Sequence, residues 1–180
     1  MTPRIPYRPA DLAEPAELVA AIRARRGGHL LNLDRMLLHS PPLARGWNEY
    51  LRAVRRELEV PPRLRELAMC AVAALNGADY EFHHHAPEFI AAGGTPAQVD
   101  ALRDPLRTVQ DNVLLALFDA PEQAALQLTV EMTREVAVSD ATFDRVRALL
   151  GERHTVELVA VVATYNMVSR FLVALGIEPE

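Results

Sequence analysis

The chain has 180 residues and a formal net charge of −5, and 50% of its residues are apolar whereas 24% are charged. This composition is typical of a globular protein and argues against disorder. The length predicts a single domain over residues 1–180. The acidic balance, with arginines spread along the chain, argues against nucleic-acid binding, and we expect no nucleic-acid partner.

The chain contains one cysteine, Cys70, which excludes an intramolecular disulfide and a zinc site built on paired cysteines. A lone cysteine fits a reducing cytoplasm. The N-terminal stretch MTPRIPYRPADLAEPAELV lacks the continuous apolar segment of a signal peptide, and we expect no window of about 18 apolar residues that spans a membrane. These features predict a soluble cytoplasmic protein with no membrane partner.

Apolar residues recur at helical spacing along almost the whole chain, and no convincing β-alternation interrupts them. Residues 1–15 carry four prolines and are predicted to form an extended arm. Paired glycines and paired prolines separate the helical segments that follow. In chain order these segments are 15–26, 29–40, 43–58, 63–77, 79–92, 95–102, 106–120, 121–136, 139–151 and 152–176. We predict an all-α fold of roughly eight or nine helices.

Three details of these segments can be compared with a structure. Asp79 is predicted to cap the helix that follows it, and Thr95 to cap the next helix with Pro96 at its first position. The unbroken apolar run from Leu158 to Ala163 predicts a helix that is buried on nearly all sides. A homo-oligomer and a central core helix explain this run about equally well, and we expect a homo-oligomer.

The segment NGADYEFHHHAPEFIAAGG contains three consecutive histidines. Successive helical positions are about 100° apart, so His83, His84 and His85 cannot all face one point. Glu81 and His85 share one face at i and i+4, whereas Tyr80 shares a face with His83 and His84. A metal site built from His85, Glu81 and a carboxylate of another helix remains an alternative. The other interpretation is that His83 and His84 are solvated residues on the surface.

Glu66 lies within the apolar stretch LRELAMCAVAAL, where burial is expected to raise the pKa of its carboxyl group. A buried acid near an imidazole is suited to proton transfer at neutral pH. The alternative is an ion pair with Arg63 or Arg65 at the start of the same helix. Cys70 follows one turn later on the same face, which is typical of a small core residue.

The stretch LRELAMCAVAALNGADYEFHHHAPEFIAAGGTPAQVDAL resembles the core of the carboxymuconolactone decarboxylase and alkylhydroperoxidase D superfamily. The stretches LLNLDRMLLHSPPLARGWNEYLRAV and VELVAVVATYNMVSRFLVAL resemble its carboxymuconolactone-decarboxylase-like members, so the resemblance covers about residues 28–175. It implies an all-α fold that assembles as dimers, trimers or hexamers, with the active site close to subunit contacts.

The peroxidase branch of this family has a glutamate and, twelve residues later, a Cys-x-x-Cys motif with a histidine between the cysteines. A second histidine follows four residues after the motif. The glutamate and the last histidine correspond to Glu66 and His85, but the cysteine positions hold Ala78 and Glu81, and Tyr80 replaces the intervening histidine. A thiol peroxidase needs a reactive thiolate and a resolving thiol, which these positions lack.

The decarboxylase branch lacks this dithiol, and in it a histidine eight residues before the helix-ending glycine serves proton transfer. His85 and Gly93 have this spacing. The resemblance therefore implies a cofactor-independent, metal-free enzyme that acts by acid-base chemistry, such as decarboxylation, on a small organic acid or lactone. His85 would supply the proton, steered by Glu66 or Glu81, and Tyr80 would bind an oxyanion.

We expect a substrate pocket lined by Cys70, Phe82 and His84 beside these catalytic residues. Two other functions remain open. The first is an antioxidant of alkylhydroperoxidase or peroxiredoxin type that uses Cys70. The second is a non-catalytic oligomeric binding protein that has kept the fold and lost the chemistry.

Overall fold

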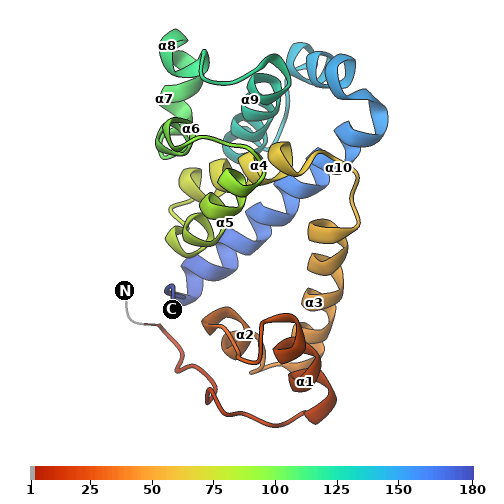
Figure 1. The fold of residues 1–180 in the computed structure, drawn as a ribbon, viewed down its shortest axis with the longest axis vertical. Coiled ribbons are helices and arrows are strands. Elements are labelled where there is room, and N and C mark those ends of the chain that lie inside the picture. The colour runs from red at the N-terminus through yellow and green to blue at the C-terminus, as the bar shows by residue number, and fades with distance from the viewer. Residues whose placement is uncertain (1–2) are drawn as a thin grey trace. The chain divides into compact units, whose positions relative to one another are not determined.

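The computed structural model describes residues 3–180, and in this part of the chain every regular element is a helix. The predicted all-α fold is confirmed (Figure 1). The helices are α1 (Ala16–Arg25), α2 (Asn32–Leu37), α3 (Pro41–Arg56), α4 (Pro62–Leu75), α5 (Asp79–Ala91), α6 (Pro96–Ala101), α7 (Pro105–Gln110), α8 (Asn112–Leu115), α9 (Ala120–Glu135) and α10 (Asp140–Leu175). Within the described chain there are thus ten helices, slightly more than predicted.

The helices differ from the predicted segments at two places. The predicted helix over 106–120 is two helices, because Asp111 adopts an extended conformation and its carboxylate accepts hydrogen bonds from the backbone N–H groups that start α8. Conversely, the segments 139–151 and 152–176 join in α10 across a kink at Gly151, whose φ of 75° and ψ of 170° are not helical. Glycine reaches this conformation without the steric cost that a side chain would add.

The start of α5 differs from the prediction, whereas the start of α6 agrees with it. Ala78, and not Asp79, occupies the N-cap position of α5, and Asp79 is the first helical residue. A carboxylate there still interacts favourably with the positive end of the helix. Thr95 caps α6 as predicted, accepting a hydrogen bond from the backbone N–H of Gln98, and Pro96 follows it.

The contacts divide the described chain into two compact units. Unit 1 contains the described residues up to Leu58 together with Leu172–Glu180, and unit 2 is Glu59–Phe171. The predicted arm is non-helical over its described residues 3–15, whereas residues 1–2 lie outside the described part. That the whole chain is one domain stays a prediction.

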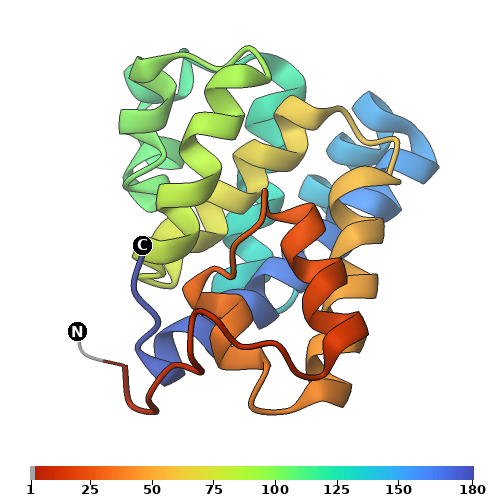
Figure 2. The same cartoon turned by 60° about the horizontal axis from the view of Figure 1, so that its bottom comes forward.

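Unit 1 packs α1 and α2 against α3, and α1 and α3 lie side by side in Figure 2. The interior of this unit includes Ile22, Leu37 and Leu51, which are almost completely buried. The buried carboxylate of Asp34 is paired with the guanidinium groups of Arg25 and Arg26, at 3.4 and 3.2 Å. A buried charge needs such partners, because its desolvation would otherwise be costly.

Unit 2 is organised around α4, which packs against both α5 and α9 (Figure 1). Small residues at Ala68, Ala71 and Ala73 are completely buried, so the neighbouring helices can approach the α4 backbone closely. The part of α10 up to Phe171 belongs to the same unit. The functional candidates Glu66, His85 and their neighbours all lie in unit 2.

The long apolar helix α10 bears on two expectations. Among residues 3–180, it is the one helix long and apolar enough to cross a membrane, with a mean hydropathy of 1.8 over 18 residues. The sequence was not expected to contain a window apolar enough to span a membrane, but this helix has one by length and composition, and half of that window is buried inside the protein.

Within a single chain, α10 is buried on one face only. Leu158, Val161 and Val162 are buried, but Ala163 is exposed, and Val156 on the same face is 68% exposed. One face of α10 therefore packs inside the protein while the other carries apolar residues at the surface. Assembly into a homo-oligomer stays a prediction.

Two glycine substitutions should have opposite effects on stability. A Cβ atom at Gly94 would lie 2.5 Å from Cε1 of the fully buried Phe89, so we expect Gly94→Ala to lower the free energy of unfolding by about 1–3 kcal/mol. A Cβ atom at the exposed helical residue Gly46 would meet nothing within 4 Å, so Gly46→Ala should raise it by about 0.5–1 kcal/mol. Urea unfolding followed by circular dichroism measures both, and a change of the same sign in both variants would contradict this packing.

Candidate acid-base site

Three buried side chains from three helices form a continuous chain of hydrogen bonds in unit 2. Oε2 of Glu66 on α4 lies 2.7 Å from Nδ1 of His85 on α5. Nε2 of the same ring lies 3.0 Å from the hydroxyl of Tyr165 on α10. The two rings meet edge to face, with centroids 4.9 Å apart. The imidazole is therefore held from both of its nitrogen atoms.

The direction of these hydrogen bonds follows from the charge on Glu66. An ionised carboxylate only accepts hydrogen bonds, so Nδ1–H of His85 donates to it. In the neutral ring Nε2 is then an acceptor and receives the hydroxyl hydrogen of Tyr165. This order of carboxylate, imidazole and hydroxyl lets the ring take up a proton at Nε2 while Glu66 balances the new positive charge.

The electrostatics of Glu66 differ from the sequence-based expectation. Burial raises the pKa of its carboxyl group, as expected, but the hydrogen bond and charge of His85 and those of Arg65 outweigh burial, so the pKa is lowered overall. Nε of Arg65 lies 3.3 Å from Oε1 of Glu66. The ion pair with Arg65 and the contact with a histidine therefore both occur.

Glu81 and Tyr80 lie near this chain but make different contacts. Oε2 of the buried Glu81 accepts a hydrogen bond of 2.7 Å from the hydroxyl of Ser169, one turn beyond Tyr165 on α10. Tyr80 is buried, and its ring centroid lies 4.5 Å from that of the half-buried His84. His83 is exposed. Of the three consecutive histidines, His85 alone is buried, in agreement with the helical geometry of the sequence.

Cys70 is completely buried on α4. Burial raises the pKa of its thiol, and the nearby carboxylates of Glu66 and Glu81 raise it further. The thiolate form is therefore strongly disfavoured at neutral pH, and the reactivity of a cysteine depends on this form.

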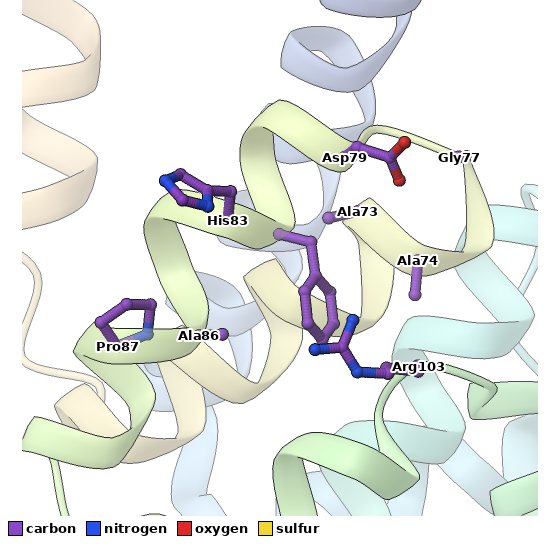
Figure 3. Close-up of a pocket in the computed structure, with 9 residues that line it drawn as sticks. Ala73, Ala74, Gly77, Asp79, His83, Ala86, Pro87 and Arg103 are labelled. Carbon is purple, nitrogen blue, oxygen red and sulfur yellow. The ribbon is translucent and has the colours of Figure 1, made fainter. Parts of the chain in front are cut away.

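A cavity of about 470 Å³ lies beside α5 (Figure 3). Asp79, Phe82, His83 and Ala86 line it, and these positions recur at helical spacing on one side of the helix. His85 does not line it. Among the residues predicted to form a pocket, Phe82 borders this cavity, whereas Cys70 and His84 do not.

No group of three or more metal-ligating side chains converges within residues 3–180. His85 and Glu81, the proposed pair of ligands, instead make the hydrogen bonds to Glu66, Tyr165 and Ser169 described above.

Tyr165 and Ser169 were missed in the sequence. They are spaced i and i+4 in the apolar stretch VATYNMVSRFLVAL, so they share one helical face that the apolar pattern marks as buried. Buried hydroxyl groups usually have hydrogen-bond partners. Their spacing was therefore a usable indication of a polar contact, but the sequence does not show which helix supplies the partner.

Solved structures with the same fold cover nearly the whole chain. A peroxidase-related protein of Ralstonia eutropha JMP134, described as an alkylhydroperoxidase AhpD core, has a TM-score of 0.80 at 20% identity over 99% of this chain and 92% of its own. A peroxidase-related protein of Silicibacter sp. TM1040 has a TM-score of 0.78 at 18% identity over 100% and 95%. A cysteine-to-alanine variant of the debrominase Bmp8, in complex with 2,3,4-tribromopyrrole, has a TM-score of 0.79 at 16% identity over 99% and 94%.

At these identities the structures show that the fold is alkylhydroperoxidase D-like. A comparison with curated proteins gave no match. The pattern of the carboxymuconolactone decarboxylase family matches residues 41–131, which is just over half of the sequence. The chain therefore belongs to the carboxymuconolactone decarboxylase family.

Proposed function

We propose that the protein is a cofactor-independent enzyme that uses acid-base chemistry on a small organic acid or lactone, as in decarboxylation. The observation that carries this proposal is the buried chain of Glu66, His85 and Tyr165. Such a chain provides an imidazole of fixed orientation beside a carboxylate, which is the equipment for proton transfer near neutral pH. Membership of the carboxymuconolactone decarboxylase family supports the same chemistry.

In the proposed reaction the substrate loses its carboxylate as carbon dioxide. The electron pair of the broken C–C bond stays on the substrate carbon and is delocalised into the adjacent carbonyl group. The substrate takes the place that the hydroxyl of Tyr165 holds at Nε2 of His85 in the resting site. The imidazolium form of His85 then gives a proton from Nε2 to the substrate carbon. Glu66 stabilises the imidazolium from which this proton comes.

Arg65 is our candidate for binding the substrate carboxylate. Its side chain is only 13% exposed, and its Nε contacts Glu66, so the guanidinium lies beside the acid-base pair. An arginine carries five N–H donors in a planar fork, and the donors at its outer end fit a carboxylate. This arrangement would place the substrate next to His85.

A thiol peroxidase reaction is the disfavoured alternative. Ala78 and Glu81 occupy the positions where the peroxidase branch has its cysteines, and Cys70 is buried with a raised pKa. Bmp8, with a similar fold, is a debrominase crystallised with 2,3,4-tribromopyrrole. Halogenated pyrroles therefore belong in the panel of test compounds beside lactones and organic acids.

Loss of the acid-base pair should strongly lower turnover. On a panel of small lactone acids, unsaturated organic acids and halogenated pyrroles, we expect His85→Ala and Glu66→Gln to lower kcat/KM by about 10²- to 10⁴-fold, because general acid-base catalysis contributes this much. His154→Ala, at another half-buried histidine of unit 2, is the control and should leave kcat/KM unchanged. Release of carbon dioxide and ultraviolet absorbance measure the turnover. Wild-type activity in both site variants would refute the proposal, and turnover of no compound would favour a binding protein.

The lowered pKa of Glu66 predicts a pH-dependent contribution to stability. The folded state favours its ionised form, so this contribution is fully present above about pH 4.5, the ordinary pKa, and is lost as the pH falls through the lowered value. We therefore expect the difference in unfolding free energy between wild type and Glu66→Gln to be largest near neutral pH and to shrink in acid. Glu88→Gln removes the same charge from an exposed position of α5 and serves as the control. A difference that does not change between pH 7 and pH 3 would contradict the prediction.

Cys70 should be unreactive in the folded protein, because its thiol is buried and its pKa is raised. At pH 8 we expect iodoacetamide to modify it at least about 100-fold more slowly in native protein than in urea-unfolded protein, as followed by mass spectrometry. Cys70→Ala should keep any peroxide-consuming activity that the wild type shows. Rapid modification of the native protein would revive the redox alternative.

A further inference from the structure

We propose that the cavity beside α5 is a second ligand site, which binds a small, flat organic monoanion such as an aromatic carboxylate. Its volume of about 470 Å³ lies within the range of small-molecule sites. All of its lining residues belong to unit 2, between Ala73 and Arg103. Its apolar walls and the two opposite charges that border it suit such a ligand.

Small side chains leave an apolar slot between α4 and α5. Ala73 and Ala74 contribute the α4 wall, and Ala86 and Pro87 belong to the α5 wall (Figure 3). The ring of Phe82 also lines the slot, and because Phe82 is itself buried, this ring is a fixed surface. An aromatic face next to small apolar groups suits a planar apolar ligand.

Arg103 supplies the positive charge at one border of the slot. Its guanidinium carbon lies 4.9 Å from the centroid of the Phe82 ring, which fixes the group by a cation–π contact. Its ion pair with Asp100 is 3.7 Å long, and the two side chains are 65% and 80% exposed. Such an exposed ion pair contributes little to the stability of the protein. Arg103 can therefore bind a ligand carboxylate through its remaining N–H groups.

Asp79 supplies a negative charge at a different border, and Figure 3 shows its carboxylate well apart from the guanidinium of Arg103. A second negative group on the ligand would meet this carboxylate and be repelled. The pocket therefore favours a monoanion over a dianion. The exposed His83 lies at the edge, where its ring adds a polar group.

This site is distinct from the acid-base pair. The lining residues of α5 lie on one side of the helix, and His85 points from another side toward Glu66 and Tyr165. Binding in the cavity therefore does not require an intact acid-base pair, and the two proposals can fail independently.

The test uses 4-fluorobenzoate as the probe and ¹⁹F NMR to follow its binding to the full chain. We expect saturable binding with a Kd on the order of 1 mM, as befits a ligand of this size. Arg103→Ala should raise the Kd about tenfold, because a charge-assisted hydrogen bond is lost. Arg107→Ala removes an exposed arginine outside the cavity and should leave the Kd unchanged. No saturable binding, or equal effects of the two variants, would overturn the proposal.

Three further measurements locate the ligand. Ala86→Leu should abolish binding by filling the slot, with the fold checked by circular dichroism. Terephthalate, a dianion of similar shape, should compete more weakly than benzoate, and Asp79→Asn should remove this difference. His85→Ala, with its fold checked in the same way, should leave the Kd unchanged. Binding that survives Ala86→Leu or disappears in His85→Ala would place the probe in another site and overturn the proposal.

Discussion

The hydrogen bond between Glu66 and His85 is the interaction on which the centre of unit 2 depends. It joins α4 to α5, and Tyr165 extends it to α10. Glu66 is a buried charge, and removing one partner of a buried ion pair typically costs about 3–5 kcal/mol. The helices must therefore keep a spacing that preserves these contacts. The same constraint fixes the orientation of the imidazole, so stability and the proposed chemistry arise from one set of atoms.

The two sides of α5 have different environments, and this separation gives the helix two roles. One side carries His85 and Glu81 into a buried polar cluster with side chains of α4 and α10. The other side borders an open cavity with small apolar walls. A helix of this kind can present a reactive group inward and a binding surface outward without either set of residues interfering with the other.

Much of the fold could be predicted from the sequence, because apolar spacing, paired prolines and the Thr95 cap are local features. The positions where a helix is interrupted or kinked were harder to predict. Asp111 splits one predicted helix through a side-chain cap, and Gly151 joins two others across a kink. The contact of Glu66 with His85 was anticipated from a family resemblance, but the direction of the Glu66 pKa shift was not, because it depends on partners from other turns and helices. Tyr165 was missed because 80 residues separate it from His85.

The wide spacing of these three residues along the chain has a consequence for biosynthesis. Glu66 and His85 leave the ribosome before Tyr165, which follows His85 by 80 residues. Domains generally fold as units during or after synthesis, so the full hydrogen-bonded chain can form only after α10 has been synthesised. Until then the carboxylate of Glu66 is more stable in contact with water. An early collapse around α4 alone would bury this charge without all its partners, which costs free energy. The site is thus complete only once α10 is present, and a chain truncated before α10 would lack it.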